Sequence, residues 1–156
     1  MIKNLIFSGC STKFFALVGC LKCLEDYNML NRKYIKNIHC TSGSVLILIL
    51  YILGYTLKEI KDYSIELNME NVIYDKNNED KIIDNLLLKK CFINYDKIKN
   101  ILTKFIYNKT KKNDISFKEL LDISGINLIV NSYCLDDNKI IYFSAIDTPN
   151  ISVMLK

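Results

Sequence analysis

Short apolar segments alternate with helical patterns along the first third of the chain. Two segments with the length of strands are each followed by a stretch with helical periodicity. These strands and helices cover residues 4–8, 13–28, 34–40 and 45–55. The last helix is continuously apolar over residues 45–53, which is too short to span a membrane and typical of a helix buried on all sides. The alternation predicts an α/β domain with a mostly parallel sheet.

The rest of the pattern predicts further helices and a β-hairpin. Two capping boxes, which begin at Thr56 and Ser116, start helices that extend to about residues 67 and 125. The turn residues Asp136-Asp137-Asn138 separate two alternating strands at residues 126–134 and 140–144. A polar loop and two amphipathic helices are predicted at residues 75–81, 82–90 and 95–109.

The composition is that of one packed domain. The chain has 156 residues, of which 50% are hydrophobic and 24% are charged, and this length suffices for a core without disulfide staples. We therefore expect residues 1–156 to form a single domain. The net charge is +4, yet Arg32 is the only arginine. Because proteins that recognise nucleic acids commonly bind phosphates and bases with arginine guanidinium groups, no nucleic-acid partner is expected.

The cysteines indicate an intracellular protein without a metal site. Cys20 and Cys23 form the only close pair among six cysteines, and no second Cys/His pair lies at zinc-ligand spacing. Reduced thiols are the default for a cytoplasmic protein. The apolar N-terminus is interrupted by Lys13, which argues against a secretory signal.

The residues that carry chemistry are Cys40-Thr41-Ser42-Gly43-Ser44, between the second strand and the apolar helix. A serine in this position is typical of a nucleophile elbow, in which a sharp turn exposes Oγ at the carboxyl edge of the sheet. The usual pattern is G-x-S-x-G, and here Cys40 and Ser44 replace the outer glycines. By itself the pentapeptide also fits a serine-rich N-cap of a buried helix.

Segments on both sides of this motif add a family resemblance. Before it come Phe7-Ser8-Gly9-Cys10-Ser11-Thr12-Lys13 and Gly19-Cys20-Leu21-Lys22-Cys23-Leu24-Glu25. After it come Ile115-Ser116-Phe117-Lys118-Glu119-Leu120, Ile126-Asn127-Leu128-Ile129-Val130, Ile141-Tyr142-Phe143-Ser144 and Thr148-Pro149-Asn150. In order and spacing this series resembles the patatin-like phospholipases, whose first loop has the form G-G-G-x-[KR]-G.

The resemblance implies a three-layer α/β fold and a lipid acyl hydrolase that uses a Ser-Asp dyad without a cofactor. Ser42 would attack the ester carbonyl of a phospholipid or another acyl lipid, at or near a membrane surface. Backbone N–H groups around Gly9, Cys10 and Ser11 would form the oxyanion hole, assisted by the Gly43 amide. The family needs no histidine, and we interpret the single histidine, His39, as a packing residue.

Several positions depart from the family pattern. Cys10, Ser11 and Phe14 stand where the family has glycines, and their side chains restrict the backbone of the loop. The dyad aspartate of the family follows the Thr-Pro turn in a D-G-G/A motif, whereas this sequence ends seven residues after Pro149. We therefore expect a C-terminally truncated member with impaired activity.

Three aspartates present in the chain are not expected to substitute for the missing base. Asp136 and Asp137 belong to the hairpin turn, Asp147 adjoins the Thr-Pro turn, and none is followed by glycine. The final residues, 151–155, are predicted to start a helix with few partners. One alternative to a weakened hydrolase is an inactive relative that acts as a lipid- or partner-binding α/β domain. Another is a plain α/β binding module unrelated to the family.

Overall fold

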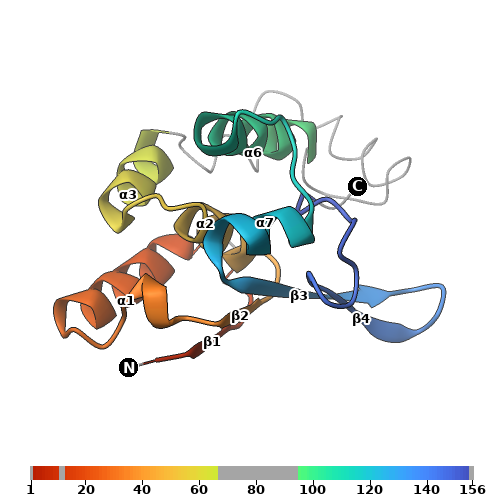
Figure 1. Cartoon of the computed structure of the whole chain (residues 1–156), viewed down its shortest axis with the longest axis horizontal. Helices are drawn as coiled ribbons and strands as arrows, with labels where there is room; N and C mark the ends of the chain where they lie inside the picture. Colours follow the sequence, from red (N-terminus) through yellow and green to blue (C-terminus); the bar gives the residue numbers. More distant parts are fainter. Residues whose placement is uncertain (1, 11–12, 67–94, 155–156) are drawn as a thin grey trace.

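The central feature of the fold is a four-stranded sheet in the order β1-β2-β3-β4 (Figure 1). The computed structural model describes residues 2–10, 13–66 and 95–154. The strands β1 (Asn4–Phe7), β2 (Asn37–Cys40) and β3 (Asn127–Cys134) run parallel, and β4 (Lys139–Phe143) pairs antiparallel with β3. The predicted α/β class with a mostly parallel sheet is confirmed.

Five helices accompany the sheet in the described part of the chain. They are α1 (Phe14–Asp26), α2 (Ser44–Ile52), α3 (Leu57–Glu66), α6 (Tyr95–Thr110) and α7 (Phe117–Ser124). Both predicted capping boxes are present, since Thr56 and Glu59 exchange hydrogen bonds at α3, as do Ser116 and Glu119 at α7. The polar loop and helix predicted for residues 75–90 lie outside the described residues.

The second strand begins later than its pattern predicts. Instead of starting at Tyr34, the chain forms a short 3-10 helix, Arg32–Tyr34, and β2 begins at Asn37. The reason is local, because the Asn31 side chain accepts a hydrogen bond from the Lys33 N–H (3.2 Å) and caps the 3-10 turn.

The two faces of the sheet differ in their cover. Leu5, Ile38 and Leu128 are aligned across β1, β2 and β3, and all three are buried in the core. In contrast, Ile6 is 79% exposed and Tyr142 is 46% exposed. Among the described residues, helices therefore cover one face of the sheet (Figure 1), and a second helical layer on the other face, which the resemblance implies, is not seen among them.

The last described residues do not form the predicted helix. Ser152 makes an antiparallel bridge with Ser116, and the Val153 N–H donates to the Ile115 carbonyl (3.0 Å). Val153 and Met154 are buried, so the expectation of few partners is also wrong. The segment forms a bend, one bridge and a turn because it pairs with the residues that precede α7, a contact distant in sequence that local propensity does not encode.

Candidate active site

Ser42 lies at the carboxyl end of β2, which is flanked by β1 and β3 in the sheet. Its backbone has φ +57°, in the left-handed region that residues with a Cβ rarely adopt, and its side chain is exposed. Helix α2 begins two residues later, at Ser44. This strand–turn–helix with a strained, exposed serine has the geometry of a nucleophile elbow.

The turn is closed by the side chain of Ser44, which is fully buried. Ser44 Oγ accepts from the Thr41 N–H (3.2 Å) and donates to the Thr41 carbonyl (2.7 Å). The Thr41 hydroxyl donates to the Asn131 side-chain oxygen on β3. Asn131 is the member of this network that the sequence analysis did not single out. Ser44 carried a local signal, whereas Asn131 is 90 positions away from Thr41.

The loop after β1 faces this turn, as predicted. A Cβ built on Gly9 would lie 3.4 Å from Ser42 Cβ and 4.0 Å from Ser42 Oγ, so the two segments are in contact. Cys10 is partly buried, which raises the pKa of its thiol, and its carbonyl accepts from the Lys13 N–H (2.8 Å). Gly43 is the N-cap of α2, at the positive end of the helix dipole.

The structure thus brings together three of the four predicted oxyanion residues and Ser42, with Gly9, Cys10 and Gly43 around the turn. The fourth, Ser11, lies outside the described residues. A cavity of about 470 Å³ adjoins the loop, with Phe7, Ala16 and Leu17 among its apolar lining. Gly9, which contacts Ser42, also lines this cavity. Ser8 and Lys13 also line the cavity, so its described lining is partly apolar and partly polar, and it reaches the Ser42 turn through Gly9.

The comparison with protein families decides the identity of this arrangement. The model of patatin-like phospholipases matches residues 5–154, nearly the whole chain. The chain belongs to the patatin-like phospholipase family. It is also 29% identical over 154 residues to the uncharacterized protein R571 of Acanthamoeba polyphaga mimivirus, a match that covers 97% of this chain and 48% of the relative. The chain therefore spans about half the length of this relative.

Solved structures support the patatin-like fold. The type III effector protein ExoU matches 97% of this chain with a TM-score of 0.62 and 16% identity, over 38% of its own length. VipD from Legionella pneumophila matches 97% of the chain with a TM-score of 0.57 and 13% identity, over 40% of its own length. At these identities the similarity is one of fold.

A serine nucleophile needs a base that accepts its proton. His39 is half-buried and packs edge-on against Tyr142, with ring centroids 5.8 Å apart, which confirms its interpretation as a packing residue. Asp136 and Asp137 lie in the turn between β3 and β4, as predicted. Asp147 accepts a hydrogen bond from Ser144 Oγ (2.7 Å). Within residues 2–10, 13–66 and 95–154, no hydrogen bond joins Ser42 Oγ to an acidic or histidine side chain.

Other chemistry in the described residues is limited. Among them, no cluster of three or more His, Cys, Asp or Glu side chains is arranged to hold a metal ion. Each helix that the structure describes falls short of the length and apolar character that crossing a bilayer requires. Cys40, directly before the turn, is fully buried, and desolvation raises the pKa of its thiol to about 12. Cys40 is therefore an inert packing residue.

Proposed function

We propose that Ser42 is the nucleophile of a lipid acyl hydrolase that cleaves ester bonds of phospholipids or related acyl lipids. The observation that supports this proposal is the left-handed, exposed Ser42 at the end of a central strand, in contact with Gly9. A turn of this shape costs conformational energy, and strain of this kind is concentrated at functional sites. Membership of the patatin-like family fits the same reaction.

The reaction would follow the general course of acyl transfer. Ser42 Oγ attacks the ester carbonyl, and its proton passes to a base while a tetrahedral oxyanion forms. Backbone N–H groups of the loop that contains Gly9 and Cys10, together with that of Gly43, stabilise the oxyanion. Collapse expels the alcohol part of the lipid and leaves an acyl-enzyme, which water hydrolyses.

We further propose that the chain is a weak catalyst by itself. Ser42 Oγ has no carboxylate partner among the described residues, and a serine without its base loses about 10⁴-fold in rate. Cys10 adds a side chain where the family has a glycine. The same two observations favour a second candidate function, an inactive relative that binds a lipid or a protein partner through the same cleft.

A fluorophosphonate probe tests the first function directly, since it reacts with nucleophilic serines. We expect slow labelling of the purified chain, and no labelling of Ser42→Ala. The matched control is Ser8→Ala, because Ser8 is also exposed at the same edge of the sheet. This variant should label like the unchanged protein.

Two outcomes would overturn the nucleophile proposal. Labelling that persists in Ser42→Ala would place the reactive serine elsewhere. A complete lack of labelling at prolonged exposure, in protein whose circular dichroism shows it folded, would leave the binding domain as the better proposal. Hydrolysis of a p-nitrophenyl ester at the rates of intact enzymes, lost in Ser42→Ala, would instead contradict the weak-catalyst proposal.

A further inference from the structure

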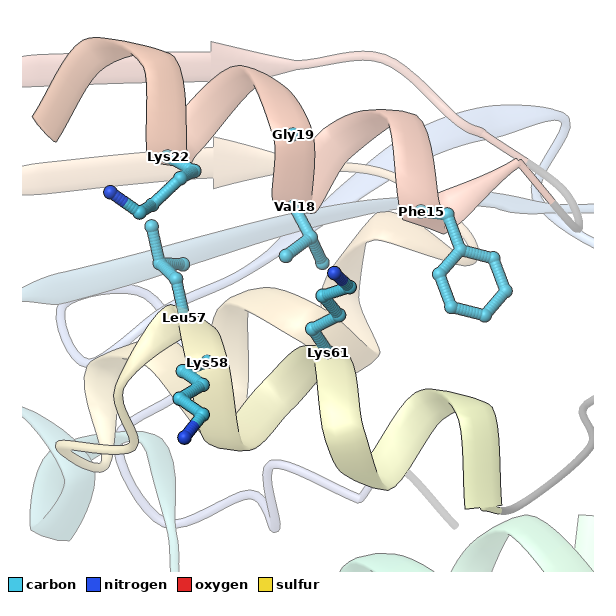
Figure 2. Close-up of a pocket in the computed structure, with 7 residues that line it drawn as sticks. All are labelled: Phe15, Val18, Gly19, Lys22, Leu57, Lys58 and Lys61. Atoms are coloured by element: carbon cyan, nitrogen blue, oxygen red, sulfur yellow. The ribbon is translucent and has the colours of Figure 1, made fainter. Parts of the chain in front are cut away.

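A second apolar groove lies between α1 and α3, outside the candidate active site (Figure 2). It has a volume of about 400 Å³, within the range of small-molecule sites. Its apolar walls are formed by Phe15 and Val18 on α1 and by Leu57 on α3. The α1 residues recur at helical spacing and therefore share one face of the helix.

Gly19 keeps this groove open on the α1 side. A Cβ built on Gly19 would meet nothing within 4 Å, and the residue does not have a positive φ. Neither close packing nor backbone conformation therefore requires glycine here, although glycine is unfavourable inside a helix. The lack of a side chain at this position leaves space that a ligand can fill.

The charged residues in the described lining of the groove are three lysines: Lys22, Lys58 and Lys61. Figure 2 shows Lys22 extending from α1 past Leu57 and Lys61 extending from α3 toward Val18, whereas the ammonium end of Lys58 points away from α1. Lys22 forms an ion pair with Asp26 on its own helix. Lys58 and Lys61 have no ion pair with any other residue that the structure describes.

Apolar walls beneath a cationic rim are complementary to an anionic amphiphile. Among the described residues, the walls offer no polar side chain for a sugar or a base, and the lysines disfavour a cationic ligand. Phe15 is 45% exposed, whereas Val18 and Leu57 are buried. An acyl chain would therefore lie along Phe15 and over the two buried side chains, with its phosphate or carboxylate headgroup at Lys22 and Lys61. Phe15, at one end of the groove, belongs to the first turn of α1, directly after the loop that contacts Ser42.

We propose that the α1–α3 groove docks the protein on anionic membranes by taking up the acyl chain and headgroup of one phospholipid. The ligand comes from the bilayer rather than from free fatty acid, because lysines close to an anionic membrane are attracted by its negative surface potential. This docking does not depend on Ser42 as a nucleophile. It would hold the loop after β1 near the lipid surface.

Vesicle flotation tests this proposal with the whole chain. We expect binding to vesicles of phosphatidylcholine with phosphatidylserine, and little binding to phosphatidylcholine alone. The double variant Lys22→Gln/Lys61→Gln should bind about 25-fold more weakly, since each lysine contributes about 5-fold at an anionic surface. Gly19→Gln, which fills the groove with a polar side chain that favours helix, should weaken binding about 10-fold or more.

The matched control is Lys3→Gln/Lys36→Gln, which removes the same charge from exposed residues that precede β1 and β2. This variant should lose much less binding than the groove double variant. Equal losses in the two double variants, or unchanged binding of folded Gly19→Gln, would overturn the proposal. Ser42→Ala should bind vesicles like the unchanged protein, so that failure of the catalytic proposal is distinguished from failure of the docking proposal.

Discussion

The candidate site is built from two neighbouring strand–turn–helix units that differ in how tightly they are constructed. In one unit β1 leads through the loop at Gly9 into α1, and in the other β2 leads through Ser42 into α2. The strands are parallel and in register, with Phe7 opposite Cys40, so the two turns meet at the same sheet edge. Their helices contrast, because α2 is buried over nearly its whole length whereas Phe15 and Cys20 of α1 are exposed.

The difference lies in how each turn is held. In the unit of Ser42, the buried Ser44 side chain hydrogen-bonds the Thr41 backbone and the Thr41 hydroxyl donates to Asn131 on β3, so these bonds hold the backbone that precedes Ser42. In the unit of Gly9, the Cys10 carbonyl accepts from the Lys13 N–H before α1 begins. Because α2 is also the more buried helix, we infer that the unit of Ser42 is the more rigid of the two.

Thiol reactivity should give the largest contrast between the units. A pKa raised from 9.0 to about 12 leaves Cys40 with roughly a thousandth of the thiolate of an ordinary thiol near pH 8. Native Cys40 should therefore react with iodoacetamide at least 10³-fold more slowly than exposed Cys20, as followed by peptide mass spectrometry. Because the fold favours the neutral thiol, its contribution to stability is present below about pH 9 and is lost as the pH rises toward 12. Comparable rates at the two cysteines in native protein would contradict the burial of Cys40.

Truncation of one leucine in each helix should give the next contrast. Leu48 on α2 is fully buried, and Leu48→Ala should lower the free energy of unfolding by about 2–5 kcal/mol. Leu24 on α1 is only partly buried at the edge of the core, so Leu24→Ala should cost less than about 2 kcal/mol. Urea unfolding measures both variants. If Leu24→Ala proved the more costly, the assignment of the rigid unit would be wrong.

The smallest predicted effect concerns strain at Ser42 itself. Ser42→Gly and Ser42→Ala both remove Oγ, but only glycine adopts φ +57° without a steric penalty. Glycine also adds conformational entropy to the unfolded chain, which offsets part of this gain. Ser42→Gly should therefore be about 0.5–1 kcal/mol more stable than Ser42→Ala. Thermal unfolding of the two variants tests this difference, and equal stability would mean that the turn is relaxed.

Features determined by local sequence were predictable. The apolar run of α2, the capping boxes of α3 and α7 and the hairpin between β3 and β4 all depend on residues within a few positions of one another. The position of Ser42 near Gly9 followed from the order of strand, turn and helix. The spacing of these elements was therefore enough to predict where Ser42 lies, even though the outer glycines of the elbow are absent.

Features that depend on distant partners were not predictable. The non-helical conformation of residues 151–154 comes from pairing with Ser116, and the hydrogen bond between Thr41 and Asn131 comes from the neighbouring strand. Neither has a signature in its own segment. The late start of β2 is a different case, since the Asn31 cap was a local signal that the apolar pattern outweighed.

The tie between Thr41 and Asn131 also bears on how the protein is made. The two residues are 90 positions apart, so the turn at Ser42 leaves the ribosome long before the strand that secures it. Until β3 is synthesised, β2 has a partner only in β1, and the edge that β3 will cover stays open to other chains. Parallel pairing over such a separation is slow to form because a long loop must close first. During synthesis there is thus an interval in which the turn at Ser42 lacks its bond to Asn131 and the open edge of β2 is a site for misassembly.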